Sequence, residues 1–119
     1  MHKISIMKPY FHLIKEGKKT IEGRKNSIKY HNLKVGDEIL FNYNDETCLT
    51  IITKINKYTN IREYLKMEKL EDSMPNIKTI KEGLKIFNNI YSNDIIDNLN
   101  TKYGYGFLSI HIKLKYQSW

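Results

Sequence analysis

The stretch G-K-K-T-I-E-G-R, residues 17–24, marks a change from one kind of local structure to another. Upstream, Pro9 fits the first turn of a helix whose inner face carries Phe11 and Ile14, and Gly17 is typical of the residue that ends such a helix. Downstream, residues 20–24 begin with two β-branched side chains and favour a strand. The stretch therefore predicts a helix, a tight turn and a short strand in succession.

Side chains on a strand alternate between its two faces, so the strand over residues 20–24 presents two different surfaces. Thr20, Glu22 and Arg24 should point one way, while Ile21 and Gly23 point the other way. We expect Ile21 to enter the core. One face then carries a hydroxyl, a carboxylate and a guanidinium in line.

This face has usable chemistry. Arg24 offers a planar fork that suits a phosphate or a carbonyl, and Lys19, just before the strand, offers a point charge for an oxyanion. Glu22 can accept a proton or bind an amino group of a base, and Gly23 permits a close approach of a ligand or another backbone. The alternative is an exposed strand face whose Glu22–Arg24 ion pair is worth under about 1 kcal/mol.

The rest of the chain extends this pattern in both directions. Alternating apolar residues predict strands over residues 2–7 and 107–114, and a hairpin over 39–43 and 48–58. Helical spacing predicts helices over about 60–70 and 79–91, whereas residues 93–101 look like a polar turn region. The order β-α-β-β-β-α-α-β is α+β and is typical of a small curled sheet or barrel.

Length and composition set the broad class. A chain of 119 residues predicts a single domain over 1–119, large enough to form a core without metals or disulfides. There is no apolar run of membrane-spanning length, and the first residues lack a secretory signal pattern. A lone Cys48 in an apolar run suits a reducing compartment. We expect an intracellular protein without membrane contact, cytoplasmic or alternatively nuclear.

The net charge of +7 is unevenly placed. Residues 1–34 hold nine Lys or Arg against two Glu, whereas the remainder holds eleven basic and eleven acidic residues. Such asymmetry is typical of proteins that bind a polyanion. An alternative source of lysine is an AT-rich genome, to which the lack of alanine and the eighteen isoleucines also point.

Other motifs are scarce. The four histidines are scattered without metal-ligand spacing, and one cysteine cannot complete a zinc site, so no metal or other cofactor is expected. Tyr103-Gly104-Tyr105-Gly106 precedes a strand, which is the wrong context for a phosphate-binding loop. Tyr105 or Phe107 could instead stack on a base, or belong to the core with the other aromatic residues.

The stretch G-K-K-T-I-E-G-R resembles the G-x-K-x-x-E-x-R signature of the ASCH (activating signal cointegrator homology) domain family, with all four signature positions occupied. The likeness extends along nearly the whole chain, through K-P-Y-F-H-L-I-K (8–15), G-D-E-I-L-F (36–41), I-F-N-N-I-Y (86–91) and G-F-L-S-I-H-I (106–112). It implies a PUA-like curled β-barrel of about five to six strands with two or three flanking helices. It also implies a role with RNA or a nucleotide, with the signature lining a cleft.

Some small bacterial members of that family remove the acetyl group from N4-acetylcytidine with a lysine, a threonine and a later helical glutamate. By resemblance the lysine is Lys19 and the glutamate is Glu82, in K-E-G-L-K-I-F. The threonine position holds Glu22 in this chain. Glu82 has a second interpretation as a solvated residue of a first helical turn, where the helix dipole favours it.

Three classes of function remain open at this stage. The first is a domain that binds RNA or a modified nucleoside through Lys19, Thr20, Glu22, Arg24 and Tyr105. The second is a hydrolase: either an amidohydrolase that uses Lys19 with Glu22 or Glu82, or a ribonuclease that uses Lys19, Glu22 and Arg24. The third is a protein-interaction module in transcription or RNA processing.

Overall fold

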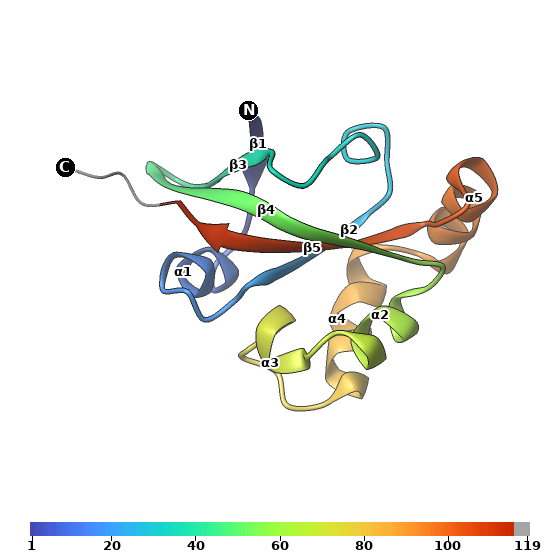
Figure 1. Cartoon of the computed structure of the whole chain (residues 1–119). Coiled ribbons are helices and arrows are strands. Elements are labelled where there is room, and N and C mark those ends of the chain that lie inside the picture. The colour runs from blue at the N-terminus through green and yellow to red at the C-terminus, as the bar shows by residue number, and fades with distance from the viewer. Residues whose placement is uncertain (116–119) are drawn as a thin grey trace.

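A computed structural model describes residues 1–115, and this part of the chain forms five strands and five helices (Figure 1). They follow in the order β1 (His2–Ser5), α1 (Tyr10–Lys15), β2 (Ile21–Lys25), β3 (Glu38–Tyr43), β4 (Glu46–Tyr58), α2 (Ile61–Met67), α3 (Leu70–Ser73), α4 (Ile80–Ile90), α5 (Asn93–Tyr103) and β5 (Phe107–Leu114). No helix within residues 1–115 is long and apolar enough to cross a membrane.

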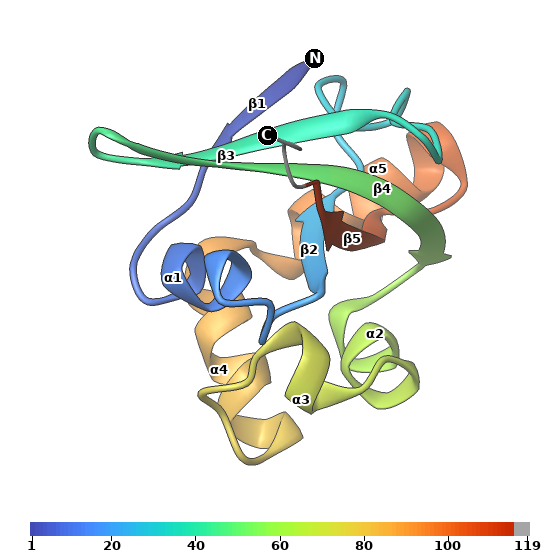
Figure 2. The same ribbon diagram turned by 60° about the vertical axis from the view of Figure 1, so that its left-hand side comes forward.

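The strands form one mixed sheet in the order β1-β3-β4-β5-β2. Only the β1–β3 pair is parallel among these strands, and β3 and β4 form the predicted hairpin. The sheet curls into a half-barrel, with β1 and β2 as its two edges (Figures 1 and 2). This confirms the α+β curled-barrel prediction.

Strand β5 is buried on both of its faces over most of its length. Leu108, Ile110 and Ile112 enter the core inside the curl, which also contains Phe11 from α1. Phe107 points the other way, into a second core that the helices cover. Figure 2 shows α2, α3 and α4 grouped on this outer side, where α2 and α4 pack together. The alternation of β5 therefore serves two cores rather than one core and solvent.

The helices differ from the expectation of two or three. Residues 93–101, predicted as a polar turn region, belong to helix α5, which begins at a Ser92 cap and ends at Gly104 in the left-handed conformation. Only Ile96 of this helix is buried, so its apolar signal was too weak to be recognised. The second missed helix, α3, has only four residues.

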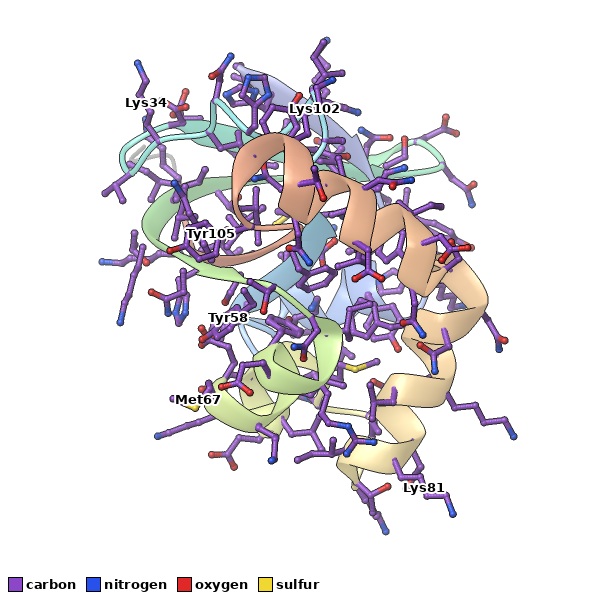
Figure 3. The ribbon with its side chains drawn as sticks, turned by 90° about the vertical axis from the view of Figure 1, so that its right-hand side faces the viewer. Lys34, Tyr58, Met67, Lys81, Lys102 and Tyr105 are labelled. Carbon is purple, nitrogen blue, oxygen red and sulfur yellow. The ribbon has the colours of Figure 1, made fainter. Side chains whose placement is uncertain are left out.

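A buried carboxylate ties the end of α2 to the sheet. Glu68 accepts hydrogen bonds from Asn56 Nδ2 at 2.7 Å and Tyr58 Oη at 2.8 Å, and it pairs with His111 Nε2 at 3.0 Å. Figure 3 shows Tyr58 where the chain passes from the sheet to α2. Burial raises the pKa of Glu68, but the hydrogen bonds from Asn56 and Tyr58 outweigh this effect, and the net pKa is lowered.

Candidate functional site

A cavity of about 310 Å³ lies between strand β2, helix α4 and the segment that follows β1. Its walls come from Glu22, Gly23 and Arg24 of β2, from the chain at residues 5–7, and from Ile86, Phe87 and Ile90 of α4. Tyr10, Lys19, Ser73, Met74 and Tyr91 complete the lining. The cavity therefore occupies the place where edge strand β2 meets the helices that cover it.

Lys19 is the most deeply buried charged group of this cavity, with only 4% of the residue exposed. Its Nζ donates to the backbone carbonyls of Ile21 and Ser73 and lies 3.2 Å from Glu22 Oε1. An ammonium has three protons, so these three partners use its whole capacity. Burial lowers the pKa of Lys19, and the carboxylate of Glu22 partly opposes that shift.

Glu22 is also buried, at 6% exposure, and its carboxylate lies between two cations. Lys19 contacts Oε1, and Arg24 Nε donates to Oε2 at 2.7 Å. The alternative of an exposed strand face with a weak ion pair is therefore not what the structure contains. The charges of a buried ion pair have lost their hydration, so removing one partner destabilises the fold more than it does at an exposed pair.

Arg24 continues this ionic chain toward the surface, with 19% of its side chain exposed. One of its terminal nitrogens, Nη2, lies 3.5 Å from the carbonyl of Ser5, and the guanidinium lies 5.8 Å from the ring centre of Tyr30. Burial alone would lower the pKa of Arg24, but Glu22 and Tyr30 raise it overall. The guanidinium is a permanent cation at the edge of the cavity.

The packing on the opposite face of β2 explains why position 23 is a glycine. A Cβ atom there would lie 2.8 Å from both Cζ and Oη of Tyr64 and 3.0 Å from Phe107 Cε2. The close approach expected at this glycine is thus made by an aromatic side chain of α2. Tyr64 packs so close to the strand that position 23 has no room for a side chain.

The walls and rim of the cavity are mostly apolar or aromatic. Tyr10 lies beneath the ammonium of Lys19, at 5.6 Å from Nζ to the ring centre, and Tyr91 lies 5.8 Å from Nζ of Lys25. Met7 and Ile90 line the cavity and are 57% and 48% exposed, so they stand at its mouth. An ionic floor under apolar walls suits a flat ligand with a polar edge.

The other predicted site residues lie elsewhere. Thr20 precedes β2 and lines a separate cavity with Ile14 and Ile112. Glu82 is exposed in the first turn of α4, where its backbone N–H and its carboxylate both bond to the Thr79 cap. Tyr105 is 46% exposed, outside the main cavity. In Figure 3, Lys81, next to Glu82, lies at the end of α4 farthest from α5, whereas Tyr105 lies beside α5.

Several residues that line the cavity were not identified as site residues from the sequence, among them Tyr91 and Ser73. Tyr91 was recognised only as part of the apolar stripe of α4, and the pattern I-F-N-N-I-Y was the available signal. Ser73 gave no signal. It is fully buried, lines the cavity, and its hydroxyl finds no hydrogen-bond partner within residues 1–115. The same described residues contain no cluster of three or more potential metal ligands.

Comparisons with known proteins agree with this architecture. The model of the ASCH domain matches residues 4–93, which include the whole G-x-K-x-x-E-x-R stretch. The crystal structure of hypothetical protein PH0355 is similar, with 31% identity and a TM-score of 0.79 over 95% of this chain and 97% of that one. The solution structure of protein PF0455 from Pyrococcus furiosus shares 29% identity and a TM-score of 0.72, over 98% of both chains. No curated protein gives a significant match.

Proposed function

The chain belongs to the ASCH domain family, and from this membership and the geometry of its cavity we propose that it binds a nucleoside unit of RNA. The base would enter the cavity between α4 and β2. The sugar and phosphates would remain at the mouth, near the basic residues of the first third of the chain. A nucleic-acid role for the family is what the sequence resemblance implies.

The observation that carries the proposal is the ionic chain of Lys19, Glu22 and Arg24. Three signature side chains are joined at the floor of one cavity, through contacts of 3.2 Å and 2.7 Å. Buried charges are costly, so a protein that keeps three of them beside a cavity is a candidate for ligand recognition. This charge arrangement presents both hydrogen-bond donors and acceptors to a base edge.

The apolar walls support the same ligand class. Single-stranded RNA is read through unstacked bases that lie against aromatic or apolar side chains while their edges meet polar groups. Tyr91 and Phe87 supply aromatic surface, and Met7 and Ile90 supply apolar surface at the mouth. A cavity of about 310 Å³ is of the size that takes one small ligand.

Two lysines are next in the chain to residues that line the cavity. Lys8 follows Met7 directly and is exposed, and Lys25 follows Arg24 on β2. Phosphate contacts release counterions, so the affinity for a single strand should fall as salt rises. Lysines near the mouth thus support a polynucleotide ligand over an isolated neutral nucleoside.

The test is a titration of a fluorescently labelled single-stranded RNA of mixed sequence at several salt concentrations. Arg24→Ala should weaken binding about tenfold or more, because a charged hydrogen bond contributes roughly 1.5–3 kcal/mol. The chain has two arginines, and exposed Arg62 on α2 provides the matched control, Arg62→Ala. Binding that ignores salt and Arg24→Ala would contradict the proposal.

A hydrolase is the second candidate, and one observation favours it. Burial lowers the pKa of Lys19, and the hydroxyl of Ser73 lies buried in the lining of the same cavity. Lys19 would have to release one of its three partners before it could polarise a substrate carbonyl. Incubation with N4-acetylcytidine, and separately with labelled RNA, tests amidohydrolase and ribonuclease action. Turnover by the wild type would support this candidate, and its absence would reject it.

A further inference from the structure

Building on the proposed function, we propose that the cavity selects guanine over the other three RNA bases. The reason is the pattern of hydrogen-bonding positions that the ionic chain leaves unused. That pattern comprises two acceptors on Glu22 next to donors on Arg24.

The acceptors follow from the capacity of the Glu22 carboxylate. Two carboxylate oxygens offer about four acceptor positions in total. Among the described residues, Oε1 meets only Lys19 and Oε2 meets only Arg24. Each oxygen therefore keeps a position for a further N–H group. Glu22 lines the cavity, so a ligand seated there meets this edge first.

The donors that remain for a ligand are found by counting the N–H groups of Lys19 and Arg24 that already have partners. The protons of Lys19 are all donated to Ile21, Ser73 and Glu22, so Lys19 adds no donor for a ligand. Arg24 spends Nε on Glu22, and Nη2 makes only a long contact of 3.5 Å with Ser5. Its terminal N–H groups thus remain for a ligand acceptor, directly beside the carboxylate.

A base that pairs with both Glu22 and Arg24 needs two neighbouring N–H donors followed by an acceptor. Guanine presents N2–H, N1–H and O6 in that order along its Watson–Crick edge. Adenine and cytosine each offer a single donor group, the exocyclic amine, and uracil offers one N–H between two carbonyls. Each of these three bases would leave one free acceptor position of Glu22 unfilled, or bring a carbonyl or ring nitrogen against the carboxylate.

The apolar walls of the cavity would orient the base so that its Watson–Crick edge meets Glu22 and Arg24. Met7 precedes α1 and Ile90 ends α4, and both line the cavity from different elements. A flat ring that enters the cavity between them would bring one edge to Glu22, which lines the same cavity. A purine ring also covers more of this apolar surface than a pyrimidine does, which favours guanine over cytosine and uracil a second time.

The experiment compares guanosine, inosine, adenosine, cytidine and uridine monophosphates by calorimetry at one salt concentration. Guanosine monophosphate should bind at least about tenfold more tightly than the last three, because only guanine fills both free acceptor positions of Glu22 and the donors of Arg24. Inosine lacks only the N2 amine, so it should lose part of that preference. Equal affinities for all five would overturn the guanine proposal and leave the proposed function standing. No binding of any nucleotide or RNA would overturn both.

Glu22→Gln tests the assigned group. The amide replaces one acceptor with a donor while keeping the size of the side chain, so the preference for guanine over inosine should disappear. Glu63→Gln is the matched control, because Glu63 is exposed on α2. An unchanged preference in Glu22→Gln would overturn the assignment. The inosine comparison needs only the wild-type protein, so the proposal remains testable even if Glu22→Gln fails to fold.

Discussion

Glu22 accepts a hydrogen bond of 2.7 Å from Nε of Arg24, two residues farther along the same strand and on the same face. Glu22 is buried beside Lys19, whereas 19% of the Arg24 side chain is exposed. Ion pairs between neighbours on a strand are usually solvated and weak. Here the carboxylate of Glu22 is buried, and the contact with Arg24 forms part of the floor of a cavity.

Lys19→Met should strongly destabilise the fold. The substitution keeps an unbranched side chain, one atom shorter, but leaves the carbonyls of Ile21 and Ser73 without a partner and one oxygen of Glu22 without its cation. Removing one member of a buried pair costs about 3–5 kcal/mol. Urea unfolding should show this loss, whereas Lys66→Met, at an exposed position of α2, should change the free energy of unfolding by less than about 0.5 kcal/mol. A loss as small as that of the control would show that Lys19 is not stabilised by these contacts.

Gly23→Ala should destabilise the fold by overpacking. The added Cβ would lie 2.8 Å from the Tyr64 ring, which is fully buried and cannot move aside. Overpacking of this kind costs about 1–3 kcal/mol. Gly83→Ala is the comparison, since its Cβ would meet the flexible ends of Leu65 and Met74 at 3.2 Å. Alanine also favours the helix by about 1 kcal/mol there, so the melting temperature of Gly83→Ala should fall less. The reverse order would contradict this account.

Glu68→Gln should remove a part of the stability that depends on pH. The pKa of Glu68 is lowered in the folded protein from its ordinary value of 4.5. Its carboxylate therefore stabilises the fold above that value, and this contribution is lost as the pH falls through the folded pKa. The wild type should exceed Glu68→Gln in free energy of unfolding at pH 7, and the gap should narrow below pH 4.5. A gap that is constant from pH 7 to the acid range would refute the assignment.

Tyr58 provides an independent readout at the other end of the pH scale. Burial, with the hydrogen bond to Glu68, raises its pKa to about 12. Because the folded pKa lies above the unfolded one, the stability that the neutral phenol contributes is complete below pH 10 and is lost as the pH rises through 12. Ultraviolet titration should show one late-ionising tyrosine fewer in Tyr58→Phe than in the wild type. An unchanged titration curve above pH 11 would contradict this.

The sequence predicted β5 well because its apolar residues alternate cleanly, β2 because β-branched residues stand at its start, and the β3–β4 hairpin because the two strands are close in the chain. It also placed Glu22 and Arg24 on one face, since that follows from strand geometry alone. The burial of Lys19 and Glu22 could not be predicted from the sequence. Lys19 is buried through a contact with the carbonyl of Ser73, 54 residues away, in a helix of four residues without a sequence signal.

The positions of the predicted residues that lie outside the main cavity have related causes. Thr20 shares the alternation of Glu22 but precedes the strand, where the chain still turns from α1, so its side chain lines another cavity. Tyr105 was chosen for its chemistry beside a basic segment, without knowledge of where its loop lies. Tyr91, by contrast, looked like core because it continues the stripe of α4, yet that stripe faces both the core and the cavity.

The contrast between Tyr91 and Tyr105 gives the last prediction. If a base stacks in the cavity, Tyr91→Ala should weaken RNA binding by about 1–3 kcal/mol, the usual effect of losing one aromatic stacking surface. Tyr91→Leu should recover part of the loss by restoring apolar area without an aromatic face. Tyr105→Ala should bind like the wild type, because Tyr105 does not line the cavity. Fluorescence anisotropy with a single labelled RNA measures all three. If Tyr105→Ala weakens binding while Tyr91→Ala does not, the base lies on the loop before β5, and the cavity is not the RNA site.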